Sequence, residues 1–345
     1  MSPTTEGQKV GTPVTHPEPR RGFTRAGISQ EAVVISVTAL LFLGLSVFLK
    51  GFLSVGNLLT LLRSVAVLGI LGVGMAIVVL GKGLDLSMVS IMAICSAWTL
   101  QLMNDGWSSL GAIAMAMGLA VLVGIINGVA VSFIEMPPLF TTLATGMLLF
   151  GVGRARLLNG MIAYVPANRE RYLHIGQGLF AGIPIPVWIF AGMALGMHLF
   201  LSRSTLGRFT YAQGDNYEAA RLSGMPVRPL TVMHYVISAL VAGLSGVVLS
   251  AEVASMNTQI FSSTLIFDVI LVVVLGGVSL LGGRGSILSV LCGTALIGTV
   301  LNGMIILNFD NNVQNIVKSA VLLGAIIVDN RLHPRDEETA RQGDI

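Results

Sequence analysis

Apolar stretches of roughly twenty residues dominate the chain, and short segments rich in Gly, Pro or charge separate them. A helix needs about twenty mostly apolar residues to cross a membrane. Breaks such as Met136-Pro137-Pro138 and Gly282-Gly283-Arg284-Gly285 mark the joins between such helices. We therefore predict an all-α, polytopic integral membrane protein with about ten transmembrane helices. The predicted spans are 32–49, 57–80, 86–103, 109–133, 138–153, 184–201, 229–250, 265–281, 286–307 and 313–329.

The two ends of the chain are polar. Residues 1–29 contain several prolines and the basic cluster Arg20, Arg21 and Arg25, which predicts a disordered cytoplasmic tail. No apolar core lies close to the N-terminus, so we expect no cleaved signal peptide. We expect one transmembrane domain over 30–330 and a second cytoplasmic tail over 331–345.

Composition narrows the class of protein. Hydrophobic residues make up 54% of the chain and charged residues 11%, whereas about a quarter of the residues in soluble domains are charged. A soluble enzyme is therefore excluded. The net charge is +3, but the basic residues form no dense run, so we expect no nucleic acid partner. Cys95 and Cys292 lie in apolar runs, which predicts neither a disulfide nor a metal site.

The distribution of Lys and Arg predicts the orientation. Most of them fall on one side if both termini are cytoplasmic, and cytoplasmic loops of membrane proteins carry an excess of Lys and Arg. This orientation places a long loop over 154–183 outside and another over 202–228 inside. The outer loop violates the rule, because it contains four arginines, namely Arg154, Arg156, Arg169 and Arg171.

The inner loop contains a short predicted helix. Asp215 or Asn216 can cap a helix over Tyr217–Leu222, and Gly224 can end it in a left-handed conformation. Glu218 and Arg221 would then be exposed. The small or apolar side chains would pack or let a partner surface come close; they are Ala219, Ala220 and Leu222. The alternative is a solvated connector with a helix cap.

This inner segment, Gly214-Asp215-Asn216-Tyr217-Glu218-Ala219-Ala220-Arg221-Leu222-Ser223-Gly224, resembles the cytoplasmic coupling loop of ribose-type ABC importer permeases. That family belongs to a larger group that carries sugars, branched-chain amino acids and nucleosides. The resemblance implies that the segment docks into a groove of a separate ATP-hydrolysing subunit. The implied coupling residues are Gly214, Asp215, Asn216, Glu218, Ala219, Ala220, Arg221 and Gly224.

Further stretches resemble the same family in the same order along the chain. Residues 80–87 are similar to its Gly-Gly-Ile-Asp-Leu-Ser signature, 137–143 to its Pro-Pro-Phe-Ile-Val-Thr-Leu stretch, and 267–286 to its late Gly-rich segment. Two regions depart from the family. Lys82 stands where the family usually has a second glycine, and residues 154–175 match poorly.

The resemblance implies a type II ABC importer-like permease that is not itself an enzyme. The chain has no phosphate-binding loop with the Gly-Lys-Ser/Thr signature. We therefore expect it to bind no cofactor, with ATP and Mg on a partner ATPase subunit. The implied partners are that ATPase, a second permease chain, a periplasmic solute-binding protein and the lipid of a bacterial inner membrane. The implied solute is a monosaccharide or polyol, with a nucleoside or a branched-chain amino acid as alternatives.

Charged residues at membrane depth are costly, so each needs a physical reason. Asp85 either caps the helix that contains Ser87 and Ser90, pairs with Lys82, or acts in gating. Asp268 and Lys318 each lie inside an apolar run, and we expect them to pair because each alone would be an uncompensated charge. A structural pair and a transport role both remain open for them.

Neutral polar residues within the spans suit a route for a polyhydroxylated solute, but such residues also serve as ordinary hydrogen-bonding contacts between helices. The candidates are Asn127, Thr141, Thr142, Thr145, Asn302 and Gln314. On the outer side, Arg169 and Arg171 are candidates for pairing with acidic residues of the binding protein.

The rival hypothesis is an ion-coupled secondary transporter that works alone. Asp85, Asp268 and Lys318 would then form a proton relay. This hypothesis does not explain the segment over 214–224. A membrane-embedded enzyme is more distant, because the five His residues are scattered along the sequence.

Overall fold

The computed structural model describes residues 30–332. The predicted N-terminal tail and most of the predicted C-terminal tail lie outside these residues. A helix occupies each of the ten predicted apolar ranges, and the six that are long and apolar enough to cross a membrane unaided are α1, α2, α4, α7, α10 and α12. The ten helices are α1 Gln30–Phe48, α2 Val55–Leu80, α3 Met88–Asn104, α4 Ser109–Ser132, α5 Pro138–Val152, α7 Ile185–Arg203, α10 Val227–Val253, α11 Leu265–Gly276, α12 Ile287–Ile306 and α13 Asn311–Leu332.

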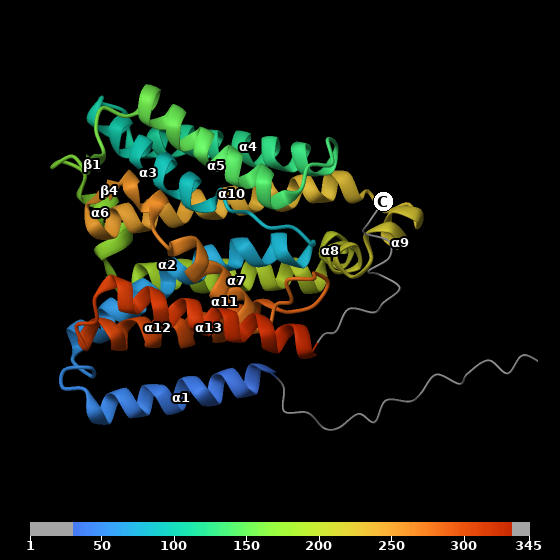
Figure 1. The fold of residues 1–345 in the computed structure, drawn as a ribbon. Coiled ribbons are helices and arrows are strands. Elements are labelled where there is room, and N and C mark those ends of the chain that lie inside the picture. Colours follow the sequence, from blue (N-terminus) through green and yellow to red (C-terminus); the bar gives the residue numbers. More distant parts are fainter. Residues whose placement is uncertain (1–29, 333–345) are drawn as a thin grey trace, which may run out of the picture.

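Small elements cluster at the two ends of this bundle (Figure 1). At the α6 end, β1 (Ile162–Tyr164) pairs antiparallel with β4 (Ser255–Asn257), beside α6 (Glu170–Gln177). At the α9 end lie α8 (Thr205–Asp215) and α9 (Tyr217–Leu222). The remaining elements are the hairpin of β2 (Leu179–Phe180) with β3 (Ile183–Pro184), a π-helical turn over Gly153–Leu157 and η2, a 3-10 helix over Thr258–Ser262.

Local sequence accounts for where these helices begin. Three serines cap the helices that follow them. The hydroxyl oxygens of Ser54, Ser108 and Ser286 each accept a hydrogen bond from the backbone N–H of the residue three positions later, in the first turns of α2, α4 and α12. Pro138 opens α5 at a position where its missing N–H costs nothing, as the Pro-Pro pair predicts.

Helix α2 is the centre of the bundle. It packs against α10 on one side and against α7, α11 and α12 on the other, and 78% of its apolar window is buried. Helices α3, α4, α5 and α10 form one layer, while α7, α11, α12 and α13 lie on the other side of α2 (Figure 1). Helix α1 lies along the edge against α12, with only 6% of its window buried.

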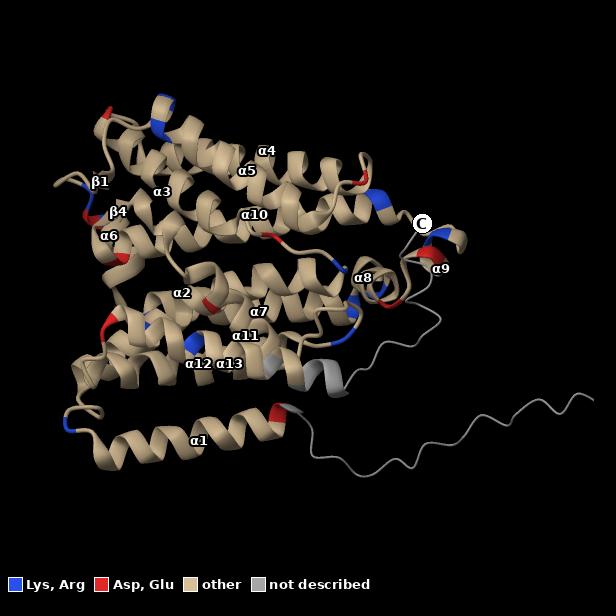
Figure 2. Cartoon of the chain, viewed as in Figure 1, with Lys and Arg blue, Asp and Glu red and all other residues tan. Residues whose placement is uncertain are grey.

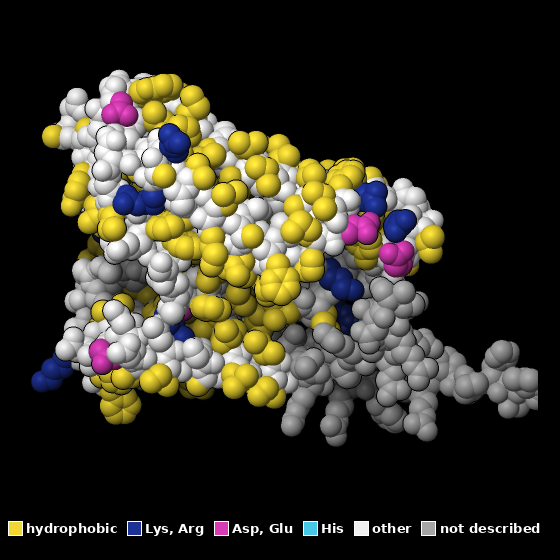
Figure 3. Space-filling view, turned by 45° about the horizontal axis from the view of Figure 1, so that its top comes forward, with side chains coloured by type: hydrophobic (Ala, Val, Ile, Leu, Met, Phe, Trp, Pro, Cys, Tyr) yellow, Lys and Arg dark blue, Asp and Glu magenta, His cyan; other side chains and the backbone are white. Residues whose placement is uncertain are grey.

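Charged side chains lie mainly at the two ends of the bundle (Figure 2). The space-filling view shows hydrophobic side chains over most of the middle of one face (Figure 3). Because lipid solvates apolar surface, this distribution is that of a multi-pass membrane protein.

Two helices at the centre are too short to cross a hydrocarbon core of about 30 Å. Helix α3 has 17 residues and α11 has 12, which correspond to about 26 Å and 18 Å. Segments that are not α-helical complete them: the α2–α3 link over 81–87 precedes α3, and residues 258–264 precede α11, which the Gly-rich loop over 277–286 follows. Irregular backbone at membrane depth persists only where protein or water satisfies it.

Lys82, in the α2–α3 link, stands where the resemblance predicts a glycine, and its backbone has a conformation that glycine adopts readily. Its φ angle is +66°, in the left-handed region, which costs a residue with a Cβ about 1–2 kcal/mol. The side chain is exposed and makes no hydrogen bond or ion pair with the residues of 30–332.

We expect Lys82→Gly to stabilise the protein by about 1 kcal/mol, because it removes this backbone strain and breaks no side-chain contact. Thermal unfolding of the detergent-purified protein measures the effect. Lys82→Ala is the control, because it removes the charge and keeps the Cβ. A glycine variant no more stable than the alanine variant would contradict the account.

Candidate functional site

Helix α9 forms an exposed tip at the α9 end. Asn216 Oδ1 accepts a hydrogen bond from the backbone N–H of Ala219 at 2.9 Å, and Gly224 follows the helix with a φ angle of +79°. The predicted capped helix is thus present, with Asn216 as its cap. Asp215, the alternative cap, is the last residue of α8.

The side chains of α9 lie differently from the prediction in part. Ala220 packs inward, but Ala219 is exposed and Leu222 is 85% exposed, so these two do not pack against the chain itself. Glu218 and Arg221 are exposed as predicted and lie 3.8 Å apart, a pair that contributes little in water. The tip thus presents a leucine beside a charged pair. Nothing in residues 30–332 covers it.

Helix α8 joins this tip to the membrane helices through a backbone contact at Gly214. A Cβ on Gly214 would collide with the carbonyl oxygen of Leu80 and the N–H of Gly283. The Gly283 N–H itself donates to the Leu80 carbonyl at 2.9 Å. The end of α8, the end of α2 and the Gly-rich loop therefore meet with no side chain between them. We call this three-way contact the Gly214 junction.

Polar side chains hold the same three segments together. Gln213 is buried and donates through Nε2 to the Gly81 carbonyl at 3.2 Å and to Thr231 Oγ1 at 2.9 Å. Tyr211 Oη donates to the Gly285 carbonyl at 3.0 Å. His234 of α10 lies 2.9 Å from Thr210 Oγ1, and its ring fills the space beside Gly81. Helix α8 is therefore hydrogen-bonded to the end of α2, to α10 and to the Gly-rich loop.

Asp85 is fully buried in the α2–α3 link, within a cluster of hydroxyls. Its Oδ1 accepts from the N–H and the hydroxyl of Ser87, and its Oδ2 accepts from Ser238 Oγ at 2.7 Å. The predicted pairing with Lys82 is wrong, because Lys82 turns outward in its left-handed conformation. The carboxylate satisfies the Ser87 N–H just before α3, but Ser87 is the N-cap residue of that helix and no side chain caps its first turn, so the capping alternative holds only in part. Ser90 belongs to α3, but its hydroxyl has no hydrogen-bond partner.

The cluster extends to α4, α5 and α10. Asn127 Nδ2 donates to Ser87 Oγ at 2.8 Å, and Thr145 Oγ1 donates to Asn127 Oδ1. Thr142 Oγ1 accepts from the Leu86 N–H at 3.0 Å, and Tyr235 Oη donates to the Leu84 carbonyl at 3.3 Å. One extended link is therefore bonded to three helices. We call this set the Asp85 hub.

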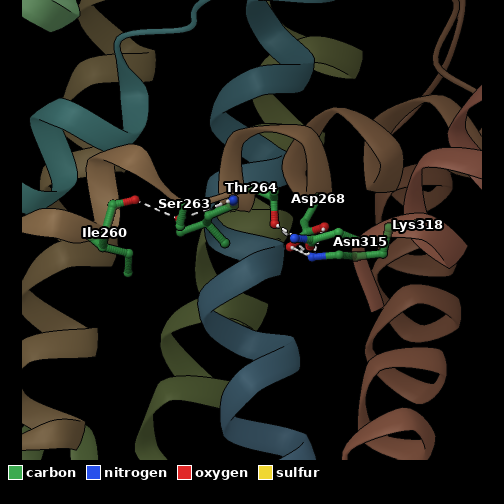
Figure 4. A network of polar contacts seen from close by, with 7 residues as sticks. Ile260, Ser263, Thr264, Asp268, Asn315 and Lys318 are labelled. Atoms are coloured by element: carbon green, nitrogen blue, oxygen red, sulfur yellow. Dashed lines mark hydrogen bonds and ion pairs between the residues drawn. The ribbon is translucent and has the colours of Figure 1, made fainter. Parts of the chain in front are cut away.

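Asp268 and Lys318 form the predicted ion pair, well away in sequence from the hub. Lys318 Nζ lies 3.0 Å and 3.1 Å from the two carboxylate oxygens and donates to Thr264 Oγ1 at 2.9 Å. Thr264 in turn donates to Asn315 Oδ1 at 3.1 Å. Figure 4 shows Thr264, which precedes α11, and Asp268 of α11 reaching Asn315 and Lys318 of α13.

Other predicted pathway residues bond elsewhere. Asn302 of α12 and Asn57 of α2 exchange amide hydrogen bonds at 2.9 Å and 3.1 Å, which joins two helices. Thr141 donates to the Pro137 carbonyl within its own helix, and Gln314 donates to the Phe309 carbonyl. The structure brings Asn127 and Thr142 to Asp85 but brings neither Asn302 nor Asp268 into the hub.

The arginines of the α6 end separate into two kinds. Arg169 Nη2 donates to the Trp107 carbonyl at 2.6 Å, and Arg154 donates to the Gly160 carbonyl. These two hold loops in place. Arg156 and Arg171 are exposed, and their side chains have no hydrogen-bond or ion-pair partner within 30–332.

The surrounding loop packs firmly on the end of α10. Tyr172 of α6 is buried with its Oη 2.6 Å from Ser250 Oγ, and burial raises the pKa of Tyr172 to about 12, so the hydroxyl stays neutral. Gly176 lies directly against the backbone of Glu252, where a Cβ would not fit. The β1–β4 pairing fixes the other side of the loop.

Sequence reasoning missed several hub and junction residues. Helix α8 itself was not predicted, because Gly207 and Gly214 weaken a helical pattern. Ser238 and His234 lie four residues apart within an apolar run, and this polar spacing was the available signal. In the described part of the chain, no group of three His, Cys, Asp or Glu side chains is placed to hold a metal ion.

Comparison with known families places these features in one protein class. Residues 57–326 match a family described as branched-chain amino acid transport system / permease component. The chain belongs to this permease family. The matched range runs from α2 into α13 and contains the Asp85 hub, the Gly214 junction and α9.

Several permeases resemble the chain over most of its length. Ribose import permease protein RbsC of Escherichia coli (strain K12) is 33% identical over 314 residues, which cover 90% of this chain and 97% of the relative. RbsC of Bacillus subtilis (strain 168) is 34% identical, covering 83% and 88%. The L-arabinose transport system permease protein AraH of Escherichia coli (strain K12) is 32% identical, covering 90% and 94%. No solved structure matches the chain.

Substitutions at Asp85 separate a structural role in this permease from a role of its charge. Asp85→Ala leaves the Ser87 and Ser238 donors unsatisfied, at about 1–3 kcal/mol for each buried group. Asp85→Asn keeps one oxygen for Ser87, and the Ser238 hydroxyl can rotate to accept from the amide. We expect the alanine variant to lose far more thermal stability in detergent than the asparagine variant.

Equal losses of stability in the two variants would contradict the hub as drawn. Solute uptake then distinguishes the remaining alternatives. A stable, active asparagine variant assigns Asp85 to structure, whereas a stable, inactive one assigns its charge to gating.

Proposed function

We propose that this chain is the permease subunit of an ABC importer that moves a monosaccharide or polyol across the bacterial inner membrane. The named relatives are ribose and L-arabinose permeases, and these match nearly the whole chain. The Gly214 junction is the observation that supports coupling to a separate motor. Because the exposed α9 tip is joined rigidly to the centre of the bundle, a partner subunit that moves the tip would also move the membrane helices.

The α9 end is cytoplasmic in this proposal, and both termini lie on that side. The Lys and Arg distribution supports this orientation. The tip offers an exposed Leu222 with Glu218 and Arg221 beside it, which fits a groove that buries one apolar side chain within a polar rim. A partner ATPase supplies that groove and binds ATP and Mg.

The junction and the hub give a mechanical route for alternating access. ATP binding by the partner brings the α9 tips of two permease chains together. Each tip carries the end of α2 with it, because Gly214 and Gln213 contact Leu80 and Gly81 directly. The link that follows holds Asp85, whose bonds reach α10 and, through Ser87, α4. A small movement at α9 thus reorients several helices as one body.

The α6 end faces the periplasm in this proposal and receives a solute-binding protein. The docked loop is rigid, since Tyr172 and Gly176 anchor it to α10. Arg156 and Arg171 are the cations of this loop that remain available for acidic residues of the binding protein. Arg169 contributes by holding the loop on Trp107.

Uptake in reconstituted vesicles tests the proposed function. We expect radiolabelled D-ribose or L-arabinose to enter only when ATPase subunit, binding protein and ATP are all present. Gly214→Ala should abolish this uptake, because its Cβ would separate α8 from Leu80 and Gly283. Gly196→Ala is the matched control, since a Cβ there meets nothing within 4 Å.

Uptake driven by an ion gradient in the absence of the ATPase would refute the importer and support a secondary transporter. Full ATP-driven uptake by the Gly214→Ala variant would leave the importer standing and refute the junction as its coupling element.

Reversing an exposed outer charge tests the docking face. We expect Arg171→Glu to raise several-fold the concentration of loaded binding protein that gives half-maximal uptake, because rim charges steer association. Lys50→Glu is the control, an exposed cation in the α1–α2 loop. Equal effects of the two variants, or none, would refute docking through Arg171.

A further inference from the structure

A cavity of about 400 Å³ lies between α11 and α13, apart from the Asp85 hub. Pockets that bind small molecules typically measure about 300–1,000 Å³. One side of this cavity is polar and the other is apolar. The polar side is formed by Thr264, Asp268, Asn315, Lys318 and Ser319, and the apolar side by Phe267, Leu271, Leu322, Leu323 and Ile326.

The polar side lies at membrane depth. Helix α11 ends at Gly276, where the Gly-rich loop continues to the Gly214 junction at the α9 end. Its 12 residues extend about 18 Å from there, so its first turn, with Asp268, lies near the middle of a core about 30 Å thick. Lys318 lies seven residues, about two helical turns, after Asn311, the first residue of α13.

Lipid chains cannot fill this cavity favourably, because its lining includes an ion pair. The side chains of Lys318 and Asp268 are 13% and 10% exposed, and hydrocarbon cannot solvate them. Before α11 the chain forms the 3-10 helix η2 and then leaves helical geometry at Ser263, and both Ser262 and Ser263 are exposed. Exposed irregular backbone at membrane depth is found where it lines a water-filled cavity or is covered by protein. This flank of the molecule therefore faces water or protein.

The cavity also contains hydrogen-bonding groups without protein partners. Asn315 uses one atom of its amide, Oδ1, to accept from Thr264, and its other polar atom bonds to nothing in residues 30–332. The Ser319 hydroxyl likewise has no partner there. Figure 4 shows Asn315 and Lys318 turned toward Thr264 and Asp268 across the gap between the helices. Such a set offers both donors and acceptors to a bound molecule.

We propose that this cavity is a solute-binding subsite on the transport route and that it holds a neutral polyhydroxylated solute. Hydroxyl groups of the solute bond to Asn315, Ser319 and the rim of the Asp268–Lys318 pair. The C–H face of the solute lies against Phe267, which is 54% exposed. This inference rests on the proposed sugar import and names where in the chain the sugar is held.

The ion pair favours a neutral solute over a zwitterion. Lys318 and Asp268 already neutralise each other at 3.0 Å. An amino acid would have to open this pair to use its own two charges, whereas a hydroxyl can bond to either group with the pair intact. Binding by exchange of water for hydroxyls is weak, which suits a site that must release its solute.

Cysteine accessibility tests whether the cavity holds water and solute. In the assembled complex, with Cys95 and Cys292 replaced by Ala, we expect Ser319→Cys to react with a charged methanethiosulfonate reagent. Excess D-ribose should slow that reaction, and excess L-leucine should not. Met115→Cys is the control. Met115 is 44% exposed on α4 and lies six residues after Ser109, the first residue of that helix. It should not react.

An unreactive Ser319→Cys would overturn the proposal, because lipid or a second copy would then cover the cavity. Protection by L-leucine rather than D-ribose would overturn the solute class. These readouts do not depend on transport, so they remain interpretable if wild-type complexes fail to import sugar and the proposed function itself is wrong.

Paired neutralisation separates binding from structure. Asp268→Asn with Lys318→Met removes both charges together, which proteins often tolerate. If the pair only holds α11 to α13, the double variant should regain both wild-type thermal stability and uptake. Under our proposal it folds but shows a KM for D-ribose uptake raised at least tenfold.

Ser319→Leu provides a second variant that leaves the ion pair in place. The residue is exposed, so folding should be preserved while the side chain occupies the cavity. We expect a raised KM here as well. A wild-type KM in Ser319→Leu, or wild-type uptake in the double variant, would overturn the proposal.

Discussion

The architecture depends on one backbone contact, where Gly214 of α8 lies against Leu80 and Gly283 with no side chain between them. Three segments distant in sequence meet there, and only glycine allows their peptide groups to come so close. The hydrogen bonds of Gln213 and Tyr211 surround this contact and make it rigid. A peripheral helix is thereby joined to α2, the helix at the centre of the bundle.

Two short membrane helices, α3 and α11, lie next to the segments that this rigid contact joins. Helices α3 and α11 are short, so the α2–α3 link and the segment before α11 occupy membrane depth that α-helix would otherwise fill. The Asp85 hub satisfies the polar groups of the link within the protein. The segment before α11 instead opens onto the cavity at Asp268 and Lys318. One interruption is therefore closed by hydrogen bonds, and the other lines the cavity that we propose as a solute subsite.

The lengths of the apolar runs and the free-energy cost of charges in lipid predicted much of the architecture from the sequence. Long apolar runs fixed the ten helices, and the expense of a lone membrane charge predicted the Asp268–Lys318 pair. The pattern could not predict which helices Asp85 would reach, because Ser238 is one hydroxyl in an apolar run. Leu222 was expected to pack and is exposed, since an apolar residue in a short helix does not reveal whether its partner is in the same chain.

The central claim is that the α9 tip and the Gly-rich loop move together when the partner ATPase binds ATP. Spin labels at Leu222 and Arg284, both exposed, measure this by dipolar electron paramagnetic resonance in the assembled transporter. We predict that the Leu222–Arg284 distance within one chain stays constant between nucleotide states, while the Leu222–Leu222 distance between the two chains changes. A change of several ångströms within one chain would contradict the account.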